Sequence, residues 1–93
     1  MTTSDKQWSS HGMRSPRQAC NVAADFVIEG RVYMGIVKNK NDNGVYIEAM
    51  GSFSVGQELT LTFMLPGARK PTKRKGRIVR ITPTGFGVEF SYG

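Results

Sequence analysis

The sequence predicts an all-β fold, a small six-stranded antiparallel β-barrel, and three observations support this. From Ala19 onward the apolar residues recur with a period of two, which is typical of strands with one buried face. Clusters of Gly, Pro, Asn and Ser separate the alternating segments, and no segment remains for a long helix. The chain has 93 residues, and closing a single sheet leaves so small a domain without unpaired strand edges.

The chain begins with a tail, and the first strand follows it. Residues 1–13 are polar and lack a period, so we expect a disordered tail before one domain at residues 14–92. In residues 20–28 every second side chain is apolar, and we expect this segment to be the first strand. It begins at Cys20, the single cysteine, which excludes an internal disulfide and is expected to pack in the core. A lone thiol also fits a reducing compartment.

Five further strands follow in chain order, each separated from the next by a turn. Residues 39–44 divide the second strand from the third, residues 51–56 precede the fourth, and residues 82–85 divide the fifth from the sixth. The alternating apolar residues, which we expect to face the core, are Val32, Met34, Ile36, Val45, Ile47, Ala49, Leu59, Leu61, Phe63, Leu65, Val79, Ile81, Phe86, Val88 and Phe90.

The composition also bounds the function. No apolar run approaches the roughly 18 residues that span a bilayer, and the N-terminus lacks a signal-peptide core. We therefore expect a cytoplasmic protein without membrane insertion. One histidine and one cysteine cannot form a structural zinc site. The carboxylates are scattered and none is paired with a base, so we do not expect an enzyme.

Two segments indicate a ligand site. The first is the turn Asn39-Lys40-Asn41-Asp42-Asn43-Gly44, where backbone N–H groups and side-chain donors gather at one end of the sheet. Gly44 is expected to accept a positive φ there, and Asn43 tolerates one. The second segment carries Arg14 and Arg17, whose guanidinium groups suit phosphate and guanine. Taken alone, Asn-Asp-Asn-Gly is also a good hairpin turn.

Together with the closing strand Gly85-Phe86-Gly87-Val88-Glu89-Phe90, these segments resemble the PilZ domain family. The resemblance covers residues 14–92 and implies a six-stranded barrel that binds the bacterial second messenger cyclic diguanylate (cyclic di-GMP). The family binds it through an R-x-x-x-R segment and a [D/N]-x-S-x-x-G turn. The residues at the matching positions are Asn39 at the D/N place, Asn41 at the serine, Gly44 at the glycine, Arg17 at the second arginine and Arg14, one residue out of step.

The resemblance implies a signalling receptor or adaptor with no further cofactor. Pro16 favours an extended segment on which Arg14 and Arg17 face one side. We expect this arm to become ordered when both arginines engage cyclic di-GMP, which changes the surface offered to a protein partner.

Two other interpretations remain open. A PilZ-like barrel can lack the nucleotide and act through protein contacts, since Asn41 and the arginine spacing depart from the family pattern. Alternatively, the seven Lys and Arg residues within residues 69–80 could bind RNA or single-stranded DNA, with Phe86 and Phe90 as stacking platforms. A solvated hairpin whose charges protect strand edges is the simpler explanation of the basic run. The partner, the oligomeric state and whether the chain is a full protein or an excised domain are not specified by the sequence.

Overall fold

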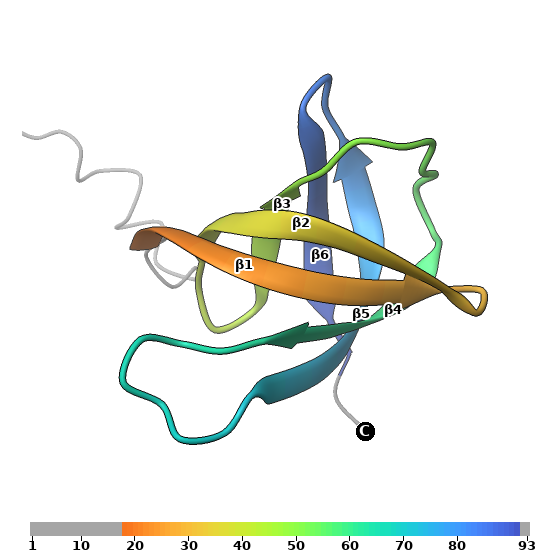
Figure 1. Ribbon diagram of the computed structural model, residues 1–93. Coiled ribbons are helices and arrows are strands. Elements are labelled where there is room, and N and C mark those ends of the chain that lie inside the picture. The colour runs from red at the N-terminus through yellow and green to blue at the C-terminus, as the bar shows by residue number, and fades with distance from the viewer. Residues whose placement is uncertain (1–17, 92–93) are drawn as a thin grey trace, which may run out of the picture.

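A computed structural model describes residues 18–91, which form a closed antiparallel barrel with the strand order β1-β2-β3-β6-β5-β4 (Figure 1). The strands are β1 (Gln18–Ile28), β2 (Arg31–Lys40), β3 (Gly44–Glu48), β4 (Glu58–Phe63), β5 (Thr72–Ile81) and β6 (Gly85–Phe90). The predicted six-stranded antiparallel β-barrel is confirmed. The expected tail and both candidate arginines, Arg14 and Arg17, lie outside the described residues. Among those described, there is no helix capable of crossing a bilayer.

One apolar core fills the barrel. Burying each large apolar side chain stabilises the fold by roughly 1.5–3 kcal/mol, so the side chains without exposed surface contribute most. These fully buried side chains are Phe26, Phe86, Ile47, Leu61, Ile78, Val37 and Val45. Phe90 is also buried, so neither it nor Phe86 can stack on a nucleic acid base. Cys20 packs against this core as expected, with its Sγ 3.5 Å from the carbonyl oxygen of Val37.

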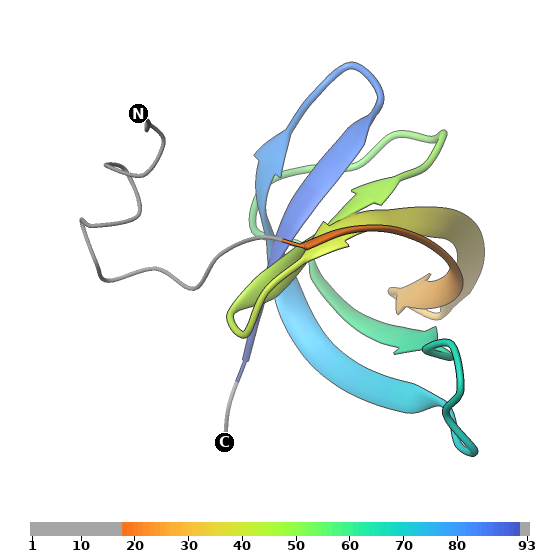
Figure 2. The same cartoon turned by 90° about the vertical axis from the view of Figure 1, so that its left-hand side faces the viewer.

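Strand β5 pairs with different neighbours along its first and second parts. Residues 72–77 pair with β4, and residues 76–81 pair with β6. Figure 2 shows the strands curving around one interior, with β5 passing from the β4 side to the β6 side. This strand was expected only around Val79 and Ile81, but it begins at Thr72 and therefore includes most of the basic run.

The inner face of β2 differs from the expected one. Val32, Met34 and Ile36 point outward and are 69%, 76% and 40% exposed. The residues between them face the core, because Tyr33 stacks on Phe26 with ring centroids 5.3 Å apart. The inner face of a strand is the one that fits its neighbours, and a one-residue shift exchanges the two faces.

The end of β5 shows the same kind of difference. Val79 and Ile81 were expected in the core, but both are exposed, whereas Ile78 is fully buried. The pairing with β6 shifts between Ile78 and Arg80, so Val79 is the extra residue of a bulge and Arg80 is turned to the outer face, opposite Gly87. Ile81 lies opposite buried Phe86 but is the last residue of β5, where it is 43% exposed.

Candidate functional site

The turn that joins β2 to β3 is shaped by the side chain of Asn41. Its Oδ1 accepts hydrogen bonds from the N–H groups of Asn43 (2.8 Å) and Gly44 (2.9 Å). The Asn41 N–H in turn donates to the carbonyl of Gly44 at 3.0 Å. Side chains of this type commonly replace backbone partners in turns. These two N–H groups are therefore bonded within the turn, which corrects the expectation that they are offered to a phosphate.

Gly44 is required by its neighbour across the sheet. The residues with positive φ among those described are Glu29, Gly30, Gly51, Gly56 and Gly67, so neither Gly44 nor Asn43 uses the left-handed conformation that both tolerate. A Cβ atom at Gly44 would instead lie 1.9 Å from the carbonyl oxygen of Val88. Any larger residue must push β3 away from β6.

Two bulges place polar residues on the outer surface beside this turn. Between Val37 and Asn39 the pairing of β2 with β3 shifts, so Asn39 lies opposite Tyr46 rather than continuing the inward face. The bulge in β5 likewise brings Arg80 opposite Gly87 of β6. Since Tyr46 is itself paired with Gly87, one outer row runs Asn39, Tyr46, Gly87, Arg80 across four strands.

Gly87 contributes no side chain to this row. A Cβ atom at Gly87 would meet only the side chain of Arg80, at 3.8–3.9 Å, so the guanidinium stem lies beside the glycine. An open pocket of about 350 Å³ lies over this part of β6, a volume at the lower end of small-molecule sites. Its lining residues are Asn41, Asn43, Gly44, Val79, Arg80, Gly87, Val88 and Glu89.

The structure thus brings together Asn41 and Gly44, two of the sequence-predicted site residues, at one wall of the pocket. Asn39 lies in the outer row nearby but does not line the pocket. Sequence reasoning missed Arg80 and Gly87 as site residues. The glycine at position 87 is a usable signal, because a glycine inside a strand often marks a place where a ligand or another part of the chain approaches the backbone closely. No sequence signal identifies Arg80, since its direction depends on a bulge.

The chain enters β1 next to the same turn. Gln18 pairs with Lys40, the last residue of β2, and its Oε1 accepts a hydrogen bond from the Lys40 Nζ at 3.2 Å. Ala19 pairs with Asn39 and so extends the outer row onto β1. The residue that follows Arg17 in the chain is therefore fixed at the edge of the candidate site.

Hydroxyl groups fix the position of Tyr46 in the outer row. Its OH lies 2.5 Å from the Thr82 Oγ1 and 2.9 Å from the Thr84 Oγ1, both in the turn between β5 and β6. These bonds hold the phenol along the outer face of β3. Tyr46 thereby links the outer row to the β5–β6 turn. This turn and the Asn41 turn lie at opposite ends of the β3–β6 pair.

The polar groups suit binding rather than metal chemistry. Exposed Arg80 and Glu89 provide one cation and one anion on the pocket wall. Within residues 18–91 no cluster of three or more His, Cys, Asp or Glu residues could hold a metal ion.

Comparisons with known proteins agree with this architecture. The model of the PilZ domain family matches residues 13–93. No curated protein matches the chain. Among solved structures, the chain is similar to the PilZ domain of CeSA from a cellulose-synthesizing bacterium, with a TM-score of 0.71 at 13% identity, covering 85% of this chain and 83% of that one.

It is also similar to the Bacillus subtilis inhibitor of motility (MotI/DgrA), with a TM-score of 0.71 at 17% identity. That match covers 85% of this chain but 42% of the other, so the chain spans less than half of that protein's length. At these identities the two structures establish a shared fold.

Proposed function

The chain belongs to the PilZ domain family, and we propose that it is a cyclic di-GMP receptor that serves as an adaptor for a protein partner. The observation that carries the proposal is the outer pocket between the Asn41 turn, Gly87 and Arg80, next to the point where β1 begins. Every element of the site has a binding role, and none requires a chemical step.

The pocket chemistry suits a guanine base. Gly87 has no side chain and is buried beside the Arg80 side chain, so a purine can lie along its backbone when that side chain moves aside. The Arg80 guanidinium can donate to the O6 and N7 acceptors of guanine. The Glu89 carboxylate, on the same wall, can accept from the guanine N1–H and N2–H groups. An adenine ring lacks O6 and the N1–H group, so the pair Arg80 and Glu89 favours guanine.

The phosphates are assigned to the arginine arm. Two N–H groups of the turn are already bonded to the Asn41 side chain, so they cannot also bind a phosphate. The negative charge of the phosphates is therefore balanced by guanidinium groups in this proposal. Arg14 and Arg17 precede Gln18, which is fixed at the turn by its pairing with Lys40. In this mechanism the arm becomes ordered over the ligand and alters the surface presented to the partner. Amide chemical shifts of Met13 to Gln18 are expected to change on saturation with cyclic di-GMP, and unchanged shifts would exclude the switch.

Calorimetric titration with cyclic di-GMP tests the proposal. Arg80→Ala removes a charged hydrogen-bond donor worth about 1.5–3 kcal/mol, so affinity should fall roughly ten- to a hundredfold. Gly87→Leu fills the pocket floor and should prevent binding. Lys73→Ala is the control, because Lys73 is a basic residue on the same strand, pairs with Thr62 of β4 and does not line the pocket.

Two results would reject the site. If Lys73→Ala and Arg80→Ala weaken binding equally, the ligand responds to general positive charge rather than to the pocket. If the unmodified protein does not bind cyclic di-GMP, the nucleotide-independent adaptor becomes the better interpretation.

A further inference from the structure

The outer face of β1 and β2 is apolar although it faces solvent. Val32, Met34 and Ile36 project from β2, and Val27 and Ala23 project from β1 at paired positions. Val27 pairs with Val32, and Ala23 pairs with Ile36, so the five side chains share one outer area two strands wide. Asp25 lies within this area, between Ala23 and Val27 on β1. We call these five residues the β1–β2 patch. Contiguous apolar surface of this kind on a soluble domain commonly marks a protein contact.

The barrel closure restricts how a partner can bind to the patch. Both strands already have hydrogen-bonded neighbours on each side, so a partner cannot add a strand to the sheet. Contact must therefore use side chains alone. Two adjacent strands make a surface about 10 Å wide, and residues 32–36 extend over about 13 Å. These dimensions match one α-helix lying along the strands, with about two turns in contact.

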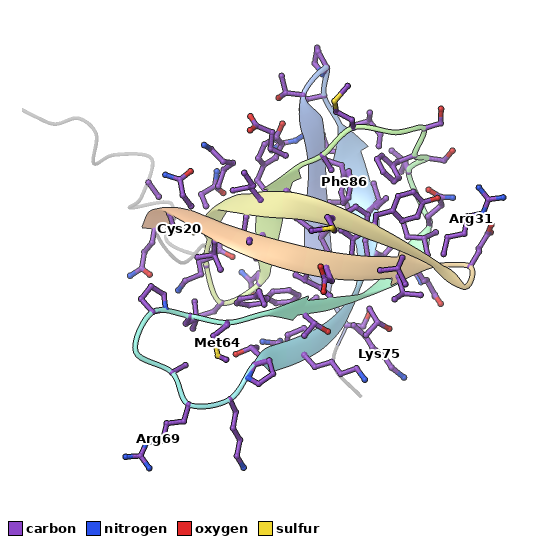
Figure 3. The ribbon with its side chains drawn as sticks, viewed as in Figure 1. Cys20, Arg31, Met64, Arg69, Lys75 and Phe86 are labelled. Atoms are coloured by element: carbon purple, nitrogen blue, oxygen red, sulfur yellow. The ribbon has the colours of Figure 1, made fainter. Side chains whose placement is uncertain are left out.

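Carboxylates outnumber basic groups in and around the patch, where the basic residues are Arg31 and Lys38, and the Lys38 Nζ donates to the Asn21 Oδ1 at 2.7 Å. Asp25 lies opposite Met34, and Glu48 lies opposite Ile36. Glu29 and Arg31 are at the β1–β2 turn, where Figure 3 shows Arg31 projecting away from the barrel. Within residues 18–91 none of the three carboxylates forms an ion pair. An acidic margin on a chain of net charge +6 is a local reversal of sign.

We propose that the β1–β2 patch docks a basic amphipathic helix of a partner protein. The apolar stripe of the helix would contact Met34 and its neighbours, and lysine or arginine side chains at its margins would pair with Asp25 and Glu48. Complementary charge of this type fixes orientation and excludes wrong partners. The proposal rests on the adaptor role given above and identifies the surface that performs it.

A designed peptide is a direct probe of the patch. The probe is a helix of about four turns with leucines on one face and lysines on both margins, and its control carries glutamates in place of the lysines. We expect the lysine peptide to shift the amide resonances of β1 and β2 and the glutamate peptide to have much weaker effects. Equal binding of both peptides, or shifts confined to other strands, would overturn the proposal.

A matched pair of variants locates the contact. Met34→Ser should weaken the lysine peptide roughly fivefold or more, because a central apolar contact is lost. Ile81→Ser is the control, since Ile81 is also an exposed apolar residue but lies at the end of β5, opposite Phe86 of β6 and on neither strand of the patch. Asp25→Lys should weaken the lysine peptide and strengthen the glutamate peptide. Equal loss in Met34→Ser and Ile81→Ser would show that the binding is not specific to the patch.

Two further measurements separate the possible outcomes. If the protein dimerises in solution and Met34→Ser abolishes the dimer, a second copy occupies the patch and the helix proposal is wrong. Met34→Ser should retain the affinity for cyclic di-GMP. Failure of the unmodified protein to bind cyclic di-GMP would reject the receptor function while leaving the peptide result intact, so the two proposals fail independently.

Discussion

The two turns at opposite ends of the β3–β6 pair have nearly the same internal structure. In the first, the Asn41 side chain accepts from the N–H groups two and three residues later, and its own N–H donates to the Gly44 carbonyl. In the second, Thr82 Oγ1 accepts from Thr84 at 3.3 Å and from Gly85 at 3.1 Å, and the Thr82 N–H donates to the Gly85 carbonyl.

Both turns also end at a glycine that is packed against backbone. A Cβ atom at Gly44 would lie 1.9 Å from the Val88 carbonyl oxygen, and one at Gly85 would lie 2.0 Å from that of Ile47. The shared design therefore serves the close approach of β3 and β6. An Asn or Thr followed three residues later by Gly therefore indicates a side-chain-capped turn between closely packed strands. By itself it does not indicate a ligand site.

The surroundings distinguish the two turns. Residues of the first turn line the outer pocket with Arg80 and Gly87, and the β1 entry at Gln18 lies beside it. The second turn is covered by the hydroxyl group of Tyr46 and does not line that pocket. A common turn thus becomes a candidate binding site through residues that are distant in the sequence.

The largest expected effect is a loss of stability, and it concerns the glycine that ends each of the two turns. Gly44→Ala and Gly85→Ala should each lower the free energy of unfolding by about 3 kcal/mol, because the methyl group cannot be accommodated without separating β3 from β6. Urea denaturation measures the loss. Gly87→Ala is the control, since its Cβ would make only ordinary contacts at 3.8–3.9 Å, and its stability should change little. Similar losses in all three variants would contradict the steric explanation.

The next largest effect is on cyclic di-GMP affinity, and it concerns the two arginines that precede the β1 entry beside the first turn. Arg17→Ala should abolish measurable cyclic di-GMP binding, and Arg14→Ala should weaken it by roughly ten- to a hundredfold, since each guanidinium contributes about 1.5–3 kcal/mol. Calorimetry measures both affinities, with Arg69→Ala as a control in the β4–β5 loop, whose side chain extends from the loop in Figure 3. Micromolar binding that neither arginine variant alters would remove the arm from the mechanism.

A smaller effect tests whether the side-chain caps are equivalent. Asn41→Ala and Thr82→Ala should each reduce the free energy of unfolding by about 1 kcal/mol, because two turn N–H groups lose their acceptor. Only Asn41→Ala should also weaken cyclic di-GMP binding, since only that turn borders the pocket. The comparison fails if Thr82→Ala reduces ligand affinity to the same extent.

The smallest effect concerns the departure of Asn41 from the serine of the family motif. Asn41→Ser keeps a side-chain oxygen acceptor of similar capping strength, so the free energy of unfolding should change by no more than about 0.5 kcal/mol. Thermal unfolding of the two proteins should almost coincide. A large loss of stability would indicate that the longer asparagine side chain is needed to reach the Asn43 and Gly44 N–H groups.

Much of the fold followed from the local pattern. The alternation and the turn residues predicted six strands and an antiparallel barrel, and the structure confirms both. The failures were the facing of β2 and of the end of β5, where exposed Met34 and Val79 were expected inside. Apolar alternation cannot choose between two apolar faces, and Tyr33 and Ile78 occupy the interior because they fit their neighbours.

The sequence by itself determined how many strands form and where the chain turns, since both depend on residues close together in the chain. Only the tertiary structure decided which side chains share the outer row, because two bulges, defined by pairing between strands, turn Asn39 and Arg80 outward. Barrel closure then sets the 41–44 turn beside Gly87 and the start of β1. The candidate site is a product of pairing between distant segments, which no local pattern specifies.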